Sequence, residues 1–150
     1  GFTEIPIFED EEADFLNVSA VYFQPVPMSG GNETIEDYDI HLEADISALA
    51  NDLGFGVGDW VPYLTVDYTV TGSDGEVAAE GTFMEMSASD GPHYGANVKM
   101  HGAGTYDCEF KFYSPEGYAL HTDPDTGVPG RFWTEPVKMH WVFKYVPRKW

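Results

Sequence analysis

Cysteine, basic residues and long apolar runs are all scarce in this chain of 150 residues. A single cysteine, Cys108, excludes an internal disulfide framework and a cysteine-rich zinc or iron–sulfur site. The 7 Lys and Arg residues oppose 26 Asp and Glu, so the formal net charge of −19 disfavours binding to nucleic acid or to an anionic membrane surface. No run is long and apolar enough to predict a membrane span, and the polar start is compatible with a mature exported form.

Apolar residues are nevertheless abundant. Hydrophobic types make up 43% and aromatic types 15% of the chain, which is enough for a folded core despite the acidity. The length predicts a single domain over residues 1–150. Such a negative surface attracts cations, including metal ions, although acidity can equally serve solubility.

Strand-like runs separated by Gly and Pro dominate the pattern, and helical periodicity is nearly absent. Strands are expected at 15–26, 38–46, 60–71, 77–87, 97–100, 106–113 and about 132–145, with a turn at 91–95. About seven strands or more at this spacing predict an all-β fold, an immunoglobulin-like antiparallel β-sandwich. Cys108 shares one face of its strand with Tyr106 and Phe110, two residues away on either side, so we expect a buried thiol.

The run 38–46 alternates cleanly between apolar and polar side chains. Ile40 and Leu42 point to one face, whereas His41 and Glu43 point to the other. An imidazole and a carboxylate therefore stand side by side on one strand face. An exposed histidine with no ligand role is the alternative.

The stretch 81–100 has the features of a metal site. Met86 lies at the end of an expected strand, and His93 follows seven residues later beyond Asp90, Gly91 and Pro92, which shape a reversal. The short connection brings the thioether and the imidazole together at little entropic cost. Sulfur with imidazole suits copper better than calcium or magnesium. A core methionine and a solvated loop histidine form the alternative.

Four motifs in order resemble the bacterial 19-kilodalton periplasmic iron-transport protein family, the proteins associated with Fe2+/Pb2+ permeases. The similarity runs from about residue 20 to residue 146. The motifs are DIHLEADI at 39–46, GTFMEM at 81–86, SDGPHYGAN at 89–97, and HTD with TGV at 121–128.

The resemblance implies a copper-binding, immunoglobulin-like homodimer that takes part in high-affinity iron uptake. By motif, the copper ligands fall on His41, Met86, His93 and His121, with Glu43 as a nearby or alternate ligand. It further implies a periplasmic or otherwise extracytoplasmic location, free or tethered at the cell surface, and an inner-membrane iron permease as partner. Copper is the implied cofactor and iron the transported ion, with manganese or zinc as candidate substitutes.

Three functions remain open at this point. The first is a metal-binding protein that hands iron to a permease; the second is a copper-dependent iron oxidase or reductase; the third is an interaction module without metal. No electron-entry motif or second copper cluster supports the enzyme, so a transport component is favoured. Because neutral imidazole is the ligand form, we expect metal binding to fade below about pH 6.5.

Overall fold

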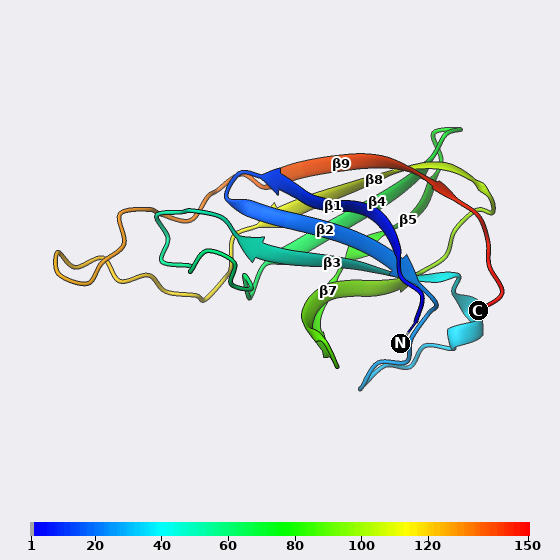
Figure 1. The fold of residues 1–150 in the computed structure, drawn as a ribbon, viewed down its shortest axis with the longest axis horizontal. Helices are drawn as coiled ribbons and strands as arrows, with labels where there is room; N and C mark the ends of the chain where they lie inside the picture. The colour runs from blue at the N-terminus through cyan, green and yellow to red at the C-terminus, as the bar shows by residue number, and fades with distance from the viewer. Residues whose placement is uncertain (1) are drawn as a thin grey trace.

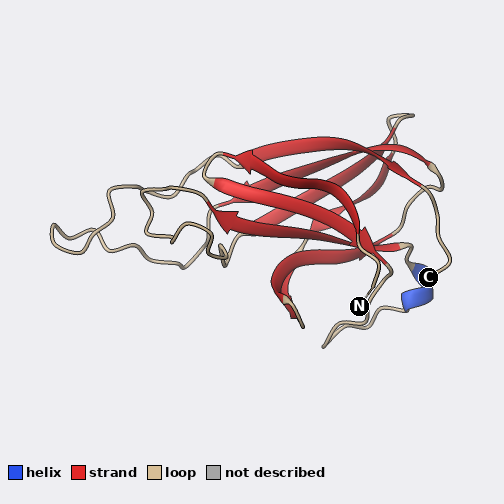
Figure 2. Cartoon of the chain, in the orientation of Figure 1, coloured by secondary structure: helices blue, strands red, loops and turns tan. Residues whose placement is uncertain are grey.

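Two antiparallel β-sheets pack face to face in the computed structural model, which describes residues 2–150 (Figures 1 and 2). One sheet has the order β1-β2-β3-β7-β6 and the other the order β5-β4-β8-β9. The strands are β1 (Ile5–Ala13), β2 (Leu16–Phe23), β3 (Ile40–Ala48), β4 (Thr65–Gly72), β5 (Val77–Thr82), β6 (Met84–Ala88), β7 (Gly91–Val98), β8 (Gly104–Tyr113) and β9 (Val137–Tyr145).

The predicted all-β antiparallel sandwich is therefore confirmed. Within residues 2–150 the helical structure is limited to one 3-10 turn, η1 (Ile35–Asp37). In that part of the chain no helix has the length and apolar character needed to cross a membrane.

The core follows from alternation along the central strands. Leu42 on β3, Val66 on β4 and Phe110 on β8 point between the sheets and are fully buried. Cys108 lies among them with 1% of its surface exposed, as its strand pattern predicts, and burial raises the pKa of its thiol. Closely packed side chains thus hold the two sheets together and fix the positions of their strands.

Strand β1 is absent from the sequence-based expectations. Its acidic run at residues 9–12 hides the period-two pattern, and the register with β2 shifts between Phe8 and Glu11. Asp10 has a φ of 50° at this irregularity. An irregular acidic strand at the edge of a sheet discourages pairing with another chain, which explains why it lacks a regular apolar signature.

The expected strand 77–87 bends at Phe83 and is shared between the two sheets. β5 pairs with β4 in one sheet, whereas β6 pairs with β7 in the other. Phe83 between them is buried, donates its N–H to Val66 O at 2.9 Å and stacks on Tyr68 at 4.5 Å. A single run of β-forming residues therefore passes from the edge of one sheet to the edge of the other rather than staying in one sheet.

The expected turn at 91–95 is wrong. β7 begins at Gly91 and continues to Val98, so His93 and Gly95 are strand residues. Pro92 is tolerated there because pairing between β3 and β7 extends only to Tyr94, and its missing N–H costs no bond to β3. Gly91, with a φ of 121°, closes the tight turn between β6 and β7 and is the first residue of β7.

Candidate metal centre

The outer face of β3 is buried around two polar side chains. His41 is 1% exposed and Glu43 is 5% exposed, although both point away from the apolar core. The aromatic ring of Phe23 covers His41 with a centroid distance of 5.2 Å. The burial shows that this face of the strand is enclosed rather than solvated, contrary to the alternative of an exposed histidine.

His93 on β7 joins these two residues to form a cluster. Its Nε2 lies 3.1 Å from Glu43 Oε1 and 3.4 Å from His41 Nε2. One ligand atom from each of the three residues lies within 4.8 Å of the others. The cluster arises because β3 and β7 are neighbours in antiparallel register, with Glu43 opposite Gly95 and His93 on the adjacent position of the same face.

The spacing of the cluster fits a metal ion. Two ligand atoms at the usual bond length to a tetrahedral centre are about 3.3 Å apart. The separations of 3.1 and 3.4 Å between the donor atoms match this spacing. Two imidazoles and a carboxylate can hold copper, zinc, iron or manganese, and a thioether would shift the preference toward copper.

Burial changes the protonation of the cluster. It lowers the pKa of His93 to about 4, aided by the nearby His41, and it also lowers the pKa of His41. Burial raises the pKa of Glu43 to about 8, with a further contribution from Asp45. At neutral pH the metal-free cluster is therefore uncharged, and the contact between His93 and Glu43 is a hydrogen bond rather than an ion pair. A bound cation would displace the proton of Glu43.

Gly95 provides the space in which the two imidazoles meet. A Cβ atom at this position would lie 2.8 Å from His41 Nε2 and 3.1 Å from His93 Cδ2. The first contact is closer than real Cβ contacts and the second is tight, so any larger residue opposite Glu43 would push the two rings from their positions. The residue that sequence analysis assigned to a turn is instead a close-approach position in the site.

Met86 lies beside the cluster on the edge strand β6. It is paired in register with His93, so the two side chains occupy the same face of the sheet. Met86 is half-buried, whereas the neighbouring Met84 is 47% exposed. Its position agrees with the predicted pairing of thioether and imidazole, and its role as a ligand stays a prediction.

His121 is separated from the other predicted ligands within the chain. Its side chain is 76% exposed in the long loop between β8 and β9. That loop projects beyond the end of the sandwich at which β3 finishes, whereas His41 lies near the beginning of β3 (Figure 1). The structure brings together His41, Glu43 and His93, with Met86 adjacent, and leaves His121 outside this group.

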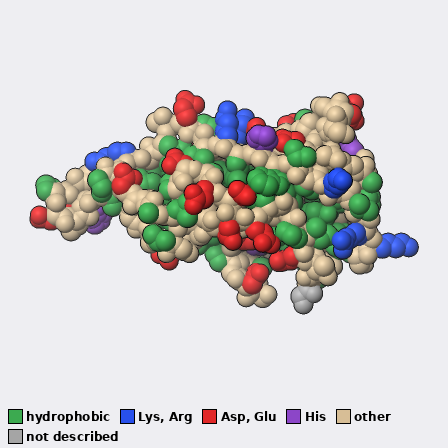
Figure 3. All heavy atoms as spheres, turned by 45° about the horizontal axis from the view of Figure 1, so that its top comes forward, with side chains coloured by type: hydrophobic (Ala, Val, Ile, Leu, Met, Phe, Trp, Pro, Cys, Tyr) green, Lys and Arg blue, Asp and Glu red, His purple; other side chains and the backbone are tan. Residues whose placement is uncertain are grey.

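A cavity of about 570 Å³ opens beside the cluster. Phe2, Phe23 and Pro27 form part of its wall, and Glu4 and Asp90 bring carboxylates to it. Acidic side chains are also spread across the middle of the face shown in Figure 3, with few Lys or Arg side chains among them. Negative charge near a concave site raises the local concentration of cations.

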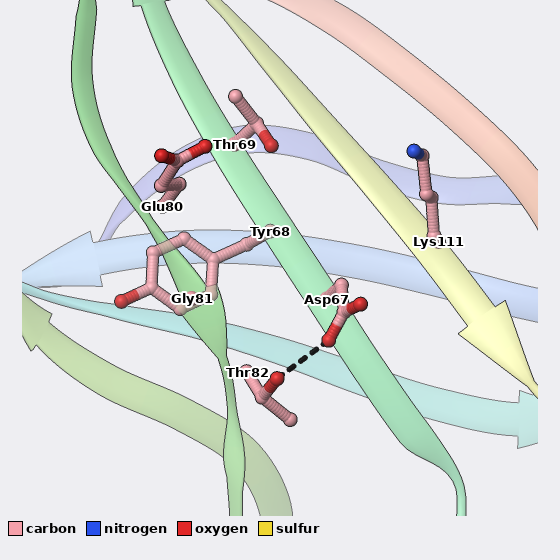
Figure 4. A pocket seen from close by; sticks show the side chains of 7 residues that line it. All are labelled: Asp67, Tyr68, Thr69, Glu80, Gly81, Thr82 and Lys111. Atoms are coloured by element: carbon pink, nitrogen blue, oxygen red, sulfur yellow. Dashed lines mark hydrogen bonds between the residues drawn. The ribbon is translucent and has the colours of Figure 1, made fainter.

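A second cavity, of about 330 Å³, lies on the outer face of the four-stranded sheet (Figure 4). Asp67, Glu80 and Lys111 contribute to its lining, and Thr82 Oγ1 donates a hydrogen bond to Asp67 Oδ1 at 2.6 Å. None of the residues labelled in Figure 4 is histidine, cysteine or methionine. Of these two cavities, the one beside β3 is the one lined by imidazoles.

Comparison with known proteins agrees with the donor set. A family model described as Fe2+ transport protein matches residues 1–147. The chain belongs to this family. The chain is also 48% identical over 149 residues to the 34 kDa membrane antigen of Treponema pallidum, covering 94% of this chain and 73% of that protein.

Two solved structures share the fold closely. FetP of uropathogenic E. coli strain F11 superimposes with a TM-score of 0.91 at 47% identity, covering 99% of this chain and 100% of FetP. Copper-reconstituted P19 of Campylobacter jejuni superimposes with a TM-score of 0.88 at 42% identity, covering 97% and 99% of the two chains. The resemblance inferred from the four sequence motifs is confirmed at the level of the family.

Sequence reasoning missed the residue that contacts the far side of His41. Asn97 Oδ1 lies 2.9 Å from His41 Nδ1, and Asn97 is 5% exposed. Its amide also bonds both the N–H and the C=O of Val26 and the carboxylate of Glu33. Asn97 closes the sequence motif at 89–97, and this was the signal that could have found it. Its partner His41 is set by the register of β3 and β7, which the sequence does not show.

Proposed function

We propose that this protein is an extracytoplasmic copper-binding component of an iron-uptake system that binds iron and hands it to a membrane iron permease. The observation that carries the proposal is the buried His41–Glu43–His93 cluster, whose donor atoms all lie within 4.8 Å of one another. Membership in the Fe2+ transport protein family supports the iron-uptake role. The copper-reconstituted state of the similar P19 supports the choice of copper.

The periplasmic location is part of this proposal. The similar FetP was expressed in the periplasm of E. coli for its structure determination. The single cysteine is buried, so the chain carries no exposed thiol for an oxidising compartment to modify among residues 2–150. An acidic surface beside the cavity would draw metal cations from such a compartment.

Copper would be held by side chains from two neighbouring strands, β7 and β6, together with β3. His41 and His93 present imidazole nitrogens, and Met86 adds a thioether from the neighbouring strand. Copper bound there would supply a redox-active centre, with the thioether favouring the reduced ion. Glu43 offers a harder oxygen donor and balances part of the positive charge of a divalent ion. Iron is the transported ion, and manganese or zinc could occupy the same oxygen and nitrogen donors.

We further propose that the protein acts as an immunoglobulin-like homodimer in which the loop carrying His121 completes the site of a second copy. Within one chain this loop projects from the opposite end of the sandwich (Figure 1). The 76% exposed side chain of His121 is available to another molecule. The arrangement reconciles the four-ligand motif with the three-residue cluster of a single chain.

The test is a copper titration of the metal-free protein, followed by iron addition to the copper-loaded form. Wild type should take up one tightly bound copper per chain, and iron should then bind the copper form more tightly than the metal-free form. His93→Ala should lose the copper, and the exposed His140→Ala should retain it. Equal copper affinity in wild type and His93→Ala would overturn the site assignment, and repeated turnover of iron oxidation or reduction would favour the enzyme instead.

A further inference from the structure

We infer that Asn97 and Thr126 are positioning residues that hold the Nδ1 protons of His41 and His121, so that each ring presents Nε2 to the metal. The inference at Thr126 rests on the proposed ligand role of His121, whereas the inference at Asn97 rests on the buried cluster alone. Outer-sphere hydrogen bonds of this kind fix the tautomer and the orientation of a ligating imidazole.

The orientation of the Asn97 amide follows from its backbone partners. Its Nδ2 donates to Val26 O at 2.8 Å and to Glu33 Oε1 at 2.9 Å, both of which are acceptors only. Its Oδ1 accepts the Val26 N–H at 3.1 Å. The opposite amide orientation would place NH2 against N–H and oxygen against two oxygens, so Oδ1 must be the atom that faces His41.

The tautomer of His41 follows from the orientation of Asn97. Asn97 Oδ1 lies 2.9 Å from His41 Nδ1, and an amide oxygen can only accept, so Nδ1 carries the hydrogen. The lone pair of a neutral His41 is then on Nε2, the atom 3.4 Å from His93 Nε2. Because His41 and Asn97 are opposite each other in the register of β3 and β7, the pairing of two strands sets this geometry.

A separate chain of hydrogen bonds acts on His121. Thr126 Oγ1 donates its single hydrogen to Asp123 Oδ1 at 2.7 Å, and hydrogen bonds from Thr126 lower the pKa of that carboxyl group. The hydroxyl oxygen can then only accept from His121 Nδ1, 2.9 Å away. His121 thus carries its hydrogen on Nδ1 and keeps the lone pair of the neutral ring on Nε2.

His41 and His121 are both held by a hydrogen-bond acceptor at Nδ1, despite their different surroundings. At His41 a buried amide anchored to the backbone fixes the ring, whereas at His121 an exposed hydroxyl held by a carboxylate does so. In both cases the loss of the acceptor would free the ring to place its hydrogen on Nε2, where it would block the metal. Affinity would fall because part of the population would present the wrong nitrogen.

The test at Asn97 compares two substitutions that both disturb its bonds to Val26 and Glu33. Asn97→Asp keeps an oxygen acceptor for His41, whereas Asn97→Ala removes it. Nitrogen NMR of the metal-free proteins should show the Nδ1–H tautomer of His41 in wild type and Asn97→Asp, and a mixture in Asn97→Ala. Copper affinity should fall about 10-fold to 100-fold in Asn97→Ala and much less in Asn97→Asp.

Thermal unfolding separates positioning from folding in this pair, since both substitutions should lower Tm. A purely structural role for Asn97 would make copper affinity follow Tm rather than the tautomer. Equal tautomer populations and equal copper affinities in Asn97→Asp and Asn97→Ala would therefore overturn the inference at His41.

The test at Thr126 uses an exposed position where folding is not at risk. Thr126→Val removes the hydroxyl and keeps the side-chain shape, and Thr126→Ser restores the hydroxyl. Thr126→Val should shift the His121 tautomer and weaken copper binding about 10-fold, and Thr126→Ser should recover both. If His121→Ala weakens copper binding but Thr126→Val does not, the inference at Thr126 is overturned. If His121→Ala has no effect, the proposed ligand role of His121 fails together with the inference at Thr126.

Discussion

The cluster on β3 and β7 and the loop between β8 and β9 place histidines in opposite kinds of environment. His41 and His93 are 1% and 4% exposed and are locked by strand register, whereas the His121 side chain is 76% exposed in a loop. Burial lowers the pKa of His93 to about 4, so the cluster is ready to bind metal without releasing a proton from this imidazole. The comparison teaches that strand register and burial can prepare ligands in advance, whereas an exposed loop histidine contributes to the site only if the proposed homodimer forms.

The largest effect should come from removing a buried ligand. His93→Ala deletes the imidazole whose Nε2 faces both Glu43 and His41. Loss of a residue that only supports a metal ligand costs up to about 100-fold in affinity, so loss of the ligand itself should cost more than about 100-fold. Competition titration with a copper chelator measures this loss. His140→Ala is the matched control, because His140 is exposed and bonds Asp107 on the other sheet. Similar losses in both variants would remove the distinction between the buried cluster and surface histidines.

The space between the two imidazoles should be the next most sensitive feature. Gly95→Ala would place a Cβ 2.8 Å from His41 Nε2, so we expect copper affinity to fall about 10-fold to 100-fold. Gly104→Ala, on β8, is the control because a Cβ there would meet no atom within 4 Å. Isothermal titration of both variants decides the matter, and unchanged affinity in Gly95→Ala would show that the rings do not need this spacing.

The pH dependence of binding should follow Glu43 rather than the histidines. The pKa of Glu43 is raised to about 8 by burial, so a cation must displace its proton at neutral pH. Copper affinity should therefore rise by up to about 10-fold per pH unit between pH 6.5 and 8. Glu43→Gln should flatten this rise. A steep dependence below pH 6.5 that survives in Glu43→Gln would instead favour the imidazoles, as the sequence alone suggests.

The loop histidine should have a smaller effect that depends on association. His121→Ala should weaken copper binding about 10-fold when the protein is dimeric and leave Tm of the metal-free protein unchanged, because its side chain is mostly exposed. Sedimentation run in parallel with the titration shows whether the effect disappears on dilution. A loss of affinity that is independent of concentration would contradict a contribution from a second copy.

The smallest effect concerns the stability of the metal-free protein. The raised pKa of Glu43, about 8, makes the folded state hold a proton that the unfolded state releases above pH 4.5, so stability falls as pH rises toward 8. The lowered pKa of His93, about 4, acts oppositely between pH 4 and 6.5. Between pH 6.5 and 8 Glu43 dominates, because the pKa of Asp45 is raised only to about 6, and the free energy of unfolding should fall by about 1 to 2 kcal/mol. Urea unfolding should show no such fall in Glu43→Gln.

Much of the fold could be predicted because its strands alternate. Ile40 and Leu42 against His41 and Glu43 indicated which face of β3 enters the core, and the same alternation located Cys108. β1 escaped prediction because its acidic run and its bulge break that period. The division at Phe83 escaped because nothing in a local pattern tells which sheet a strand joins.

The candidate site could be predicted less completely, and for a different reason. Spacing along the chain related Met86 to His93, and the family motifs added His41, Glu43 and His121. Asn97 and Gly95 were missed because their importance lies across a strand pair, in contacts that only register determines. The pH dependence expected from ordinary imidazole pKa values was wrong for the structure, because the outer face of β3 is buried. That burial depends on segments distant in sequence, such as Phe2 and Pro27, which line the cavity beside the cluster.

The bend at Phe83 makes the two sides of the proposed metal site differ in rigidity. β3 and β7 have a neighbouring strand on each side, but β6 is a five-residue edge strand paired only with β7. In the proposed site, an ion would be held by imidazoles from two inner strands and by the thioether of Met86 from the edge strand. Opening of short edge structure costs little free energy, so an incoming ligand would displace Met86 first and the imidazoles last. Phe83, which is buried and donates its N–H to Val66 O, fixes the residue at which this edge strand leaves the other sheet.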